Sequence, residues 1–326
     1  MTVARRHVLC LAAATVAAVA IPRIAATQTY PIRPLRFIVP FAPGSTAETV
    51  ARILATKLTE QLGQQVIVDT RPGGTGVIGI EIAKNAPADG YTLLAAGITA
   101  LALLPALKPK LPYDADKDFV ALSRVTSTST VVVVHPSLGV GTVAELVKLA
   151  KARPGQLNYG SAGNGSAQHV AAELFNLLAG VKTIHVPYKS ANLVLPDLIA
   201  GQVQFMIVSA PAVMPQAKAG RIKLIATTGA TRDPLLPDLP IVADVLPGFE
   251  STSWTGVAVP ARTPVAIVNK LHAEIVKALH TPEVREQYAK QGATAHPESP
   301  AEFTAFIKVE RERIARVGRQ VGITVD

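Results

Sequence analysis

The sequence predicts an α/β protein made of two similar units. Short runs of β-branched residues alternate with segments of helical periodicity, which is typical of parallel βαβ construction. Each unit also carries a loop rich in glycine and hydroxyl side chains between a predicted strand and a predicted helix. The chain has 326 residues, more than a single hydrophobic core usually covers, so we expect two domains.

The first unit is expected to alternate strands and helices from its first buried segment onward. In chain order it contains a strand at 35–39, a loop at 40–46, a helix at 47–62, a strand at 66–68, a helix at 77–85 and a strand at 92–95. Asp89 and Gly90 mark the turn before the last of these strands.

The second unit repeats this order. It contains a strand at 131–134, a helix at 143–152, a strand at 157–159, a helix ending near 178, a strand at 183–186, a helix at 192–200 and strands at 205–208 and 223–226. The proline-rich stretch 234–247 is expected to be irregular. A return strand at 254–259 and helices at 264–279 and 301–318 complete the chain.

Residues 1–26 have the features of a secretory signal peptide. Arg5 and Arg6 supply the positive charge, an apolar stretch follows over 8–21, and small residues provide a cleavage site. The apolar stretch is too short to span a membrane. We therefore expect export to the periplasm, by the Sec or the twin-arginine route. Cys10 is the only cysteine and is removed with this segment, which excludes disulfides and cysteine metal sites from the mature protein.

The charge of the chain favours small anions over nucleic acids as partners. The formal net charge is +9, and +6 remains once Arg5, Arg6 and Arg23 are removed with the signal peptide. These charges are scattered and form no basic stripe with aromatic neighbours, so nucleic-acid binding is not expected. Mild basicity attracts small anions instead. The histidines show no metal-ligand spacing, and we expect neither a metal nor a cofactor.

The segment Tyr159–His169 is the most informative part of the sequence, because a glycine-rich loop leads directly into a predicted helix. The first turn of a helix leaves N–H groups without partners and carries the positive end of the helix dipole. Bare backbone and hydroxyl groups at that end suit a carboxylate or a phosphate. The alternative is a well-capped helix with a flexible lead-in. The candidate ligand residues here are Ser161, Gly163, Asn164, Gly165, Ser166 and His169.

A similar loop follows the first predicted strand. Its candidate ligand residues are Phe41, Pro43, Gly44, Ser45, Thr46 and Glu48. Glu48 is expected either to complement the helix dipole or to bind a ligand amine or a bridging water.

Other motifs give weaker signals. Gly74–Gly79 matches G-x-G-x-x-G but lacks the acidic residue that dinucleotide binding needs about 20 positions on, so a tight turn is the preferred interpretation. Ser161 lacks the G-x-S-x-G frame of a hydrolase nucleophile. Lys189 either binds an anion or is a solvated loop lysine, and Trp254 either packs in the core or lines a cleft.

Nine ordered motifs identify a known family. They are Ile38–Phe41, Arg71–Gly73, Ala88–Leu94, Lys110–Asp114, Pro154–Tyr159, Gly163–Gly165, His185–Lys189, Gly201–Gln204 and Leu246–Glu250. From Tyr30 to the C-terminus the chain resembles the Bug-type extracytoplasmic solute-binding receptors of tripartite tricarboxylate transporters. The resemblance implies a type II periplasmic-binding-protein fold, in which two lobes, each a mixed sheet flanked by helices, are joined by two crossover strands. Lobe 1 would comprise 27–127 and 254–326, and lobe 2 would comprise 128–253.

The resemblance also adds site residues and shows where this chain departs from the family. The added candidates are Gly97, Ile98, Thr99, Tyr188 and Ser209, which join Lys189 and Trp254 named above. The family's first loop usually reads Pro-Gly-Gly-Gly-Thr-Asp, whereas Glu48 stands here in place of the Asp. Thr99 is the only polar side chain in a loop that usually carries Ser or Thr, His and Asn. The pocket is therefore expected to be less polar than that of a dicarboxylate receptor and to take a monocarboxylate with an apolar or aromatic remainder.

The function predicted from these features is capture of a small organic carboxylate between two lobes, without chemistry. The carboxylate would accept N–H bonds from 163–166 and hydroxyl bonds from Ser161, Ser45, Thr46 or Thr99. The receptor would be a monomer and would deliver its solute to membrane permease subunits. Two alternatives remain open, a sensor feeding a periplasmic signalling domain and an enzyme on the same scaffold. The lack of a nucleophile–base pair disfavours the second.

Overall fold

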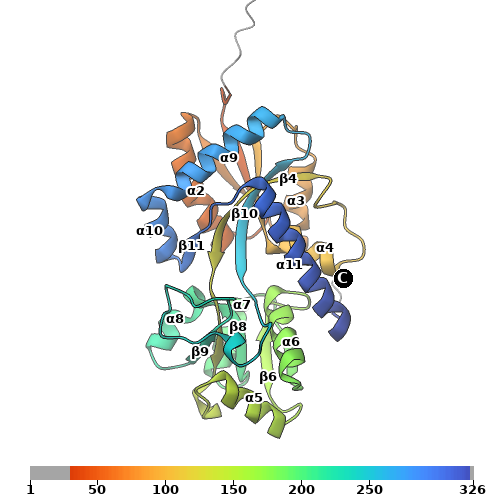
Figure 1. Cartoon of the computed structure of the whole chain (residues 1–326), viewed down its shortest axis with the longest axis vertical. Helices are drawn as coiled ribbons and strands as arrows, with labels where there is room; N and C mark the ends of the chain where they lie inside the picture. The colour runs from red at the N-terminus through yellow and green to blue at the C-terminus, as the bar shows by residue number, and fades with distance from the viewer. Residues whose placement is uncertain (1–29, 324–326) are drawn as a thin grey trace, which may run out of the picture. The chain divides into compact units, whose positions relative to one another are not determined.

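A computed structural model of the chain describes residues 30–323. The predicted signal peptide, with Cys10, lies outside these residues. From Arg33 onward the chain forms one unit with two β-sheets, each flanked by helices (Figure 1). We call the six-stranded sheet with its helices the first lobe, and the five-stranded sheet with its helices the second lobe.

The sheet of the first lobe has the strand order β11-β4-β10-β3-β1-β2. Its strands are β1 (Leu35–Val39), β2 (Val66–Thr70), β3 (Thr92–Gly97), β4 (Phe119–Thr128), β10 (Ser253–Pro260) and β11 (Ala293–Ala295). Strands β1, β2 and β3 are parallel, whereas β10 runs antiparallel to both β3 and β4. The helices of this lobe are α2 (Thr46–Leu62), α3 (Val77–Lys84), α4 (Leu104–Leu107), α9 (Val265–His280), α10 (Pro282–Lys290) and α11 (Pro300–Val321).

The sheet of the second lobe has the strand order β7-β6-β8-β5-β9. Its strands are β5 (Thr130–Val134), β6 (Asn158–Ser161), β7 (Ile184–Pro187), β8 (Phe205–Ser209) and β9 (Lys223–Thr227). Strand β6 is parallel to β7 and β8, and β5 is antiparallel to β8 and β9. The helices are α5 (Val143–Ala152), α6 (Ala167–Ala179), α7 (Ala191–Ile199) and α8 (Ala210–Lys218).

The predicted helices and strands are present with small differences at their ends, but several further elements were not predicted. Strand β4 escaped notice because polar residues such as Arg124 interrupt its apolar pattern. Helix α8 contains Pro211 and Pro215, which are usually read as loop signals. The stretch 234–247 has no strand or long helix, as expected.

The chain passes between the two sheets twice. Strand β4 ends at Thr128 and β5 begins at Thr130, and a long segment leads from β9 back to β10. Hydrogen bonds join the two passages, because the hydroxyls of Thr130 and Thr228 both donate to Ser251 O, at 2.8 and 2.6 Å. The exact lobe boundaries given above stay a prediction.

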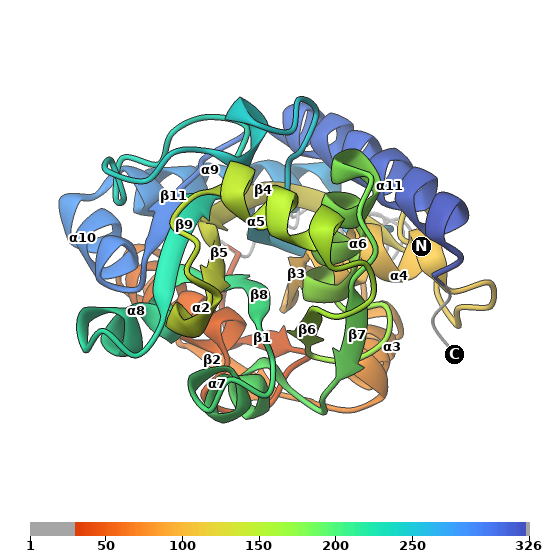
Figure 2. The same ribbon diagram turned by 90° about the horizontal axis from the view of Figure 1, so that it is seen from below.

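Strand register fixes which ends of the strands face the boundary between the lobes. Thr255, near the start of β10, pairs with Gly97 at the end of β3. Thr130, the first residue of β5, pairs with Ser209 at the end of β8. Both β10 and β5 begin where the chain passes between the sheets. Since β1 is parallel to β3 and β6 to β8, the carboxyl ends of all four strands face that boundary, and Figure 2 shows them superimposed near the centre of the view.

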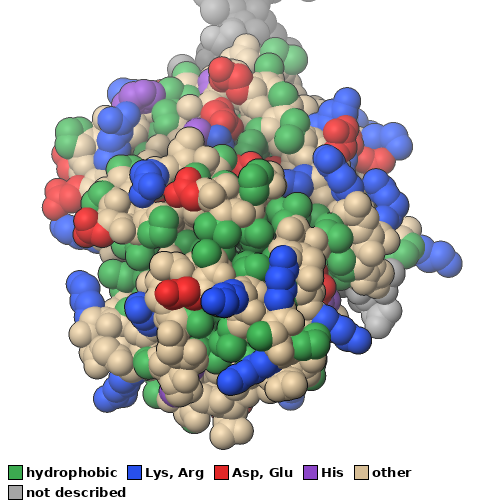
Figure 3. Space-filling view, turned by 60° about the horizontal axis from the view of Figure 1, so that its bottom comes forward, with side chains coloured by type: hydrophobic (Ala, Val, Ile, Leu, Met, Phe, Trp, Pro, Cys, Tyr) green, Lys and Arg blue, Asp and Glu red, His purple; other side chains and the backbone are tan. Residues whose placement is uncertain are grey.

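Two further features of the described residues are the distribution of surface charge and the character of the helices. On the face shown in Figure 3, Lys and Arg side chains are distributed over the surface, with Asp and Glu among them, and do not form one continuous stripe. Among residues 30–323, no helix combines the length and the apolar character needed to cross a bilayer.

Candidate ligand-binding site

The predicted site residues lie mainly in loops that follow the strand ends at the lobe boundary. Such crevices at strand carboxyl ends are where open α/β sheets bind ligands. One contact between the lobes is direct, because Ile98 after β3 lines the same small space as Ala167 and Val170 of α6. That space measures about 20 Å³. Its other lining residues are Leu103, Ala171, Leu174, Glu250, Ser251, Arg313, Ile314 and Val317.

Helix α2 begins with a self-contained cap over Gly44–Glu48, which we call the α2 cap. Ser45 is the N-cap residue, and its Oγ accepts the N–H of Glu48 at 3.3 Å. The Glu48 side chain folds back, so that its Oε2 accepts the Gly44 N–H at 2.6 Å. Glu48 is 7% exposed. A carboxylate of the protein itself therefore already occupies part of the predicted anion site.

The Glu48 carboxylate is held in its ionised form. The bond from the Gly44 N–H and the bonds from the Arg52 guanidinium, at 2.8 and 2.5 Å, keep the pKa of this carboxyl below its usual range. The first-turn amides of Thr46 and Ala47 have no acceptor within residues 30–323. They are the N–H groups that the α2 cap still offers.

Helix α6 begins with the same arrangement over Gly165–His169, which we call the α6 cap. Ser166 is the N-cap residue, and its Oγ accepts the N–H of His169 at 3.2 Å. The Nδ1 of His169 accepts the Gly165 N–H at 3.0 Å. Burial, with a smaller effect from His185, lowers the pKa of His169 to about 4. The ring is neutral at pH 7, and the Gly165 bond assigns its proton to Nε2.

A stack of three rings supports the α6 cap. His169 lies on His185 with 3.9 Å between ring centroids, and His185 lies on Tyr159 at 4.9 Å. The Tyr159 hydroxyl donates to Glu173 Oε1 at 2.5 Å, which together with burial raises the pKa of that tyrosine. His185, in strand β7, therefore supports the α6 cap from a neighbouring strand.

The glycine loop satisfies most of its own hydrogen bonds. Ser161 is fully buried, and its Oγ accepts the Gly163 N–H at 3.0 Å and lies 2.6 Å from His185 Nε2. The Ser166 N–H donates to Gly163 O at 3.1 Å. Three expected ligand donors, the Gly163, Gly165 and Ser166 amides, are therefore engaged within the protein. In the described part of the chain, the amides of Asn164, Ala167 and Gln168 have no acceptor.

The other predicted site residues differ in solvent exposure. Tyr188 donates its hydroxyl to Asp197 Oδ2 at 2.6 Å and its N–H to Ser161 O at 3.0 Å, so it braces the loop. The exposed residues are Pro43, Gly44, Thr46, Asn164 and Lys189, and the half-buried ones are Phe41, Ile98, Thr99 and Ser209. Gly97 is buried, and a Cβ there would lie 2.8 Å from Trp254 O.

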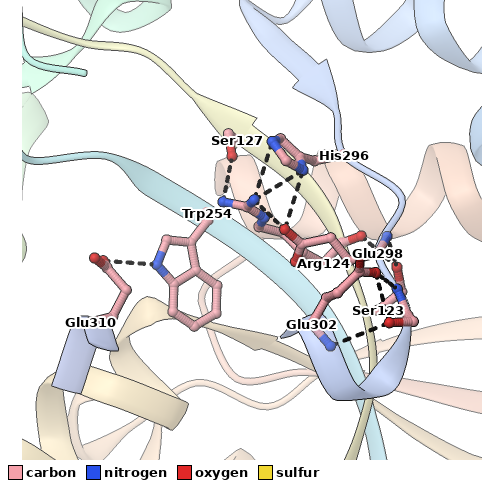
Figure 4. A network of polar contacts seen from close by, with 9 residues as sticks. Ser123, Arg124, Ser127, Trp254, His296, Glu298, Glu302 and Glu310 are labelled. Atoms are coloured by element: carbon pink, nitrogen blue, oxygen red, sulfur yellow. Dashed lines mark hydrogen bonds and ion pairs between the residues drawn. The ribbon is translucent and has the colours of Figure 1, made fainter. Parts of the chain in front are cut away.

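Trp254 lies in the core. It is 2% exposed, and its Nε1 donates to Glu310 Oε2 at 3.3 Å (Figure 4). Its ring meets the rings of Phe303 and Phe306 edge-on. Of the two roles considered for Trp254, packing is the one that the structure displays.

Two ion pairs show which contacts leave a signal in the sequence. Arg124 forms an ion pair with Glu298, which is far away in the chain, so no local pattern could reveal it (Figure 4). The Arg52 partner of Glu48 does have a local signal, the i, i+4 spacing of opposite charges on a helix.

Comparison with known proteins gives a consistent result. Residues 50–323 match the family described as "Tripartite tricarboxylate transporter family receptor". Protein BugT of Bordetella pertussis is 36% identical over 297 residues, which cover 90% of this chain and 91% of that protein. The "UPF0065 protein in tcbD-tcbE intergenic region" of Pseudomonas sp. is 36% identical over 288 residues, covering 88% of this chain and 85% of that protein.

Solved structures of similar chains share the fold. R. palustris Rpa4515 with adipate has a TM-score of 0.81 and 33% identity, covering 90% of this chain and 99% of that one. MatC from Rhodopseudomonas palustris with bound malate has a TM-score of 0.76 and 29% identity, covering 88% and 99%. The predicted two-lobed periplasmic-binding-protein fold is confirmed. This chain belongs to the tripartite tricarboxylate transporter receptor family and has the solute-binding role of that family.

Proposed function

We propose that the protein is a periplasmic receptor that captures a small organic carboxylate between its lobes and delivers it to a tripartite membrane permease. The observation that carries the proposal is the placement of two capped helix starts, one from each lobe, at strand ends that face the same boundary. Family members solved with adipate and malate support a carboxylate as the ligand class.

The open amides of the glycine loop and the α6 cap are the proposed carboxylate site. Asn164, Ala167 and Gln168 can donate to the ligand without breaking an internal bond. Hydrogen bonds to a charged group contribute about 1.5–3 kcal/mol each. Three such bonds contribute about 4.5–9 kcal/mol in total. Micromolar binding needs about 8 kcal/mol net of the cost of immobilising the ligand, so burial of the rest of the solute has to supply part of the binding free energy.

The remainder of the solute is proposed to be apolar or aromatic. Ile98, Leu103 and Val170 supply apolar surface where the lobes meet, and Thr99 is the polar side chain of the loop after β3. The proposal therefore favours a monocarboxylate over a tricarboxylate. We further propose that the receptor is exported to the periplasm and acts as a monomer.

Native mass spectrometry of the exported protein, followed by titration calorimetry with the identified solute, tests the proposal. A bound organic acid with one carboxylate and a 1:1 stoichiometry is the expected result. Copurification of a sugar or a cation, or the absence of heat with a broad panel of organic acids, would contradict it. A preference for citrate over benzoate would contradict the monocarboxylate part alone.

A further inference from the structure

We propose that a groove between helices α8 and α10 is a second binding site, which takes a small, uncharged apolar alcohol or phenol. The groove has a volume of about 520 Å³. Its walls come mainly from α8, from the segment after β9 and from the end of α10 with the turn before β11. No residue named above as a ligand contact lines it. The proposal therefore goes beyond the carboxylate receptor function and does not depend on it.

The two lobes touch beside this groove. Helices α8 and α10 lie next to each other at the left of Figures 1 and 2, whereas α6 lies at the right of both views. Gly292, in the turn between α10 and β11, approaches Pro211 at the start of α8 very closely. A Cβ on Gly292 would lie 2.3 Å from Pro211 Cγ. A molecule bound in the groove would therefore contact both lobes, away from the α6 cap.

The walls of the groove are largely apolar. Met214 and Leu236 are half-buried, and Leu235 is 39% exposed. Pro211 and Pro215 add two apolar rings from α8. The thioether of a methionine adapts to the shape of an apolar ligand, and burial of apolar surface favours binding. The groove therefore suits a hydrocarbon chain or a single aromatic ring.

Asp233 supplies an acceptor that the protein does not use. This residue lines the groove and is 8% exposed, and its Oδ1 accepts the Leu235 N–H at 2.9 Å. Its Oδ2 is buried and has no hydrogen-bond partner among residues 30–323. A buried carboxylate oxygen without a partner is costly, so Oδ2 requires a donor from outside the chain. Because Oδ2 is closed to solvent, side chains at this end of the groove have to shift slightly as the donor binds.

The charges around the groove favour a neutral donor. An anionic ligand would lie beside the Asp233 carboxylate, whose burial leaves little water to screen it. Lys218 and Lys290 also line the groove, are exposed and oppose the entry of a cation. A cation would in addition lose its hydration against apolar walls. A hydroxyl group avoids these costs and still donates to Oδ2.

NMR titration of the purified protein with three one-ring probes tests the proposal. The probes are benzyl alcohol, toluene and benzylammonium, which have similar size and differ in donor and charge. Benzyl alcohol is expected to bind with 1:1 stoichiometry and about tenfold more tightly than toluene, because toluene lacks the donor. It is also expected to bind more tightly than benzylammonium.

Two pairs of matched variants locate the bound probe. Asp233→Asn keeps an acceptor for the Leu235 N–H but loses the Oδ2 acceptor, and should weaken benzyl alcohol binding about tenfold. Its control, Asp238→Asn, changes an exposed aspartate of the same segment and should leave the affinity unchanged. Leu235→Ser should weaken binding severalfold, whereas Val245→Ser, at a residue that is 40% exposed and outside the groove, should not.

The outcomes decide between a ligand and solvent at Oδ2. Asp233 also borders a more polar space of about 320 Å³. Equal affinity for benzyl alcohol and toluene, or no change in Asp233→Asn, would mean that water satisfies Oδ2 and would overturn the proposal. An unchanged affinity in Leu235→Ser would place the probe elsewhere and overturn it too. Tighter binding of benzylammonium than of benzyl alcohol would overturn the assignment of an uncharged ligand.

Discussion

The starts of α2 and α6 are built from the same five-residue frame, a glycine, a serine N-cap, two first-turn residues and a side chain that folds back. In the α2 cap the Glu48 side chain accepts the Gly44 N–H, and in the α6 cap the His169 side chain accepts the Gly165 N–H. One closing group is an anion and the other a neutral ring. The frame sets the backbone geometry, and the closing residue sets the charge that a ligand meets.

The start of α5 has a similar frame, with threonine as the N-cap residue, at the far end of the second sheet. Its Gly141 N–H donates to Glu145 Oε2 at 2.6 Å, the same length as the Gly44 to Glu48 bond. The caps of α2 and α6 differ from it in following strands whose carboxyl ends face the other lobe. We therefore expect sheet register, as much as cap sequence, to decide which helix start meets a ligand.

The largest effect on the free energy of unfolding is expected from adding a methyl group at a closely packed glycine near each cap, Gly79 for the α2 cap and Gly160 for the α6 cap. A Cβ at Gly79 would lie 2.8 Å from both Arg71 O and Pro40 Cα, which are backbone atoms next to the loop that leads to α2. A Cβ at Gly160, in the strand before the α6 cap, would lie 2.2 Å from Val194 Cγ1, the end of a side chain. Gly79→Ala should lower the free energy of unfolding by about 3 kcal/mol, and Gly160→Ala by about 1 kcal/mol, in urea titrations.

A double-mutant cycle checks the physical reason for this difference. Val194→Ala makes room for the new methyl group, so the Gly160→Ala and Val194→Ala changes should be less than additive. No side-chain truncation can relieve Gly79→Ala in the same way, because its obstacles are backbone atoms. Equal losses for the two glycine variants would mean that the backbone obstacle at Gly79 and the side-chain obstacle at Gly160 yield alike.

The sequence predicted most strands and helices, but it did not reveal those that depend on partners far away in the chain. The order of strands and helices followed from periodicity, and α5 begins and ends where its pattern predicts. Strand β4 could not be predicted in this way, because it contains the buried Arg124, whose charge is paired with Glu298, far away in the chain. Chain-distant partners of this kind leave no local signal.

The positions of the two helix starts were predictable from the sequence, but their hydrogen bonds were not. Glycine and hydroxyl residues placed both caps correctly at helix starts. The fold-back of Glu48 matches the S-x-x-E capping pattern and was readable from the sequence. The equivalent role of His169 was not, since it requires stacking on His185 from another strand. The engaged amides of the glycine loop depend on such side-chain positions.

Lowering the pH is expected to have an intermediate effect on the stability of the fold, and the pH range of this effect differs between the two caps. The pKa of His169 is lowered from 6.5 to about 4, so its neutral form stabilises the fold fully above pH 6.5. This contribution, about 1–2 kcal/mol after allowance for solvent screening, is lost as the pH falls from 6.5 towards 4. The pKa of Glu48 is lowered from 4.5, so its contribution is lost only below that value.

The variant His169→Phe distinguishes the stacking of the His169 ring from its role as a hydrogen-bond acceptor. The phenyl ring can keep the stack on His185, but it cannot accept the Gly165 N–H. Thermal unfolding between pH 4 and 6.5 should depend less on pH in this variant than in the wild type. His280→Phe, at an exposed position, is the matched control and should retain the wild-type slope. An unchanged slope in His169→Phe would assign the pH dependence to other groups.

The smallest effect is expected from the N-cap hydroxyls, and it compares the two caps most directly. Ser45→Ala and Ser166→Ala each remove an acceptor for a first-turn N–H, at 3.3 and 3.2 Å, and each should lower the free energy of unfolding by about 1 kcal/mol. The two variants should differ in ligand binding. Ser166→Ala loosens the cap that is proposed to donate to the solute carboxylate and should weaken the binding of hexanoate, a monocarboxylate, severalfold. Ser45→Ala changes the cap that holds Glu48 and should leave hexanoate affinity close to wild type in calorimetry. Equal weakening by both variants would mean that the carboxylate contacts both caps, and a carboxylate site at the α6 cap alone would be wrong.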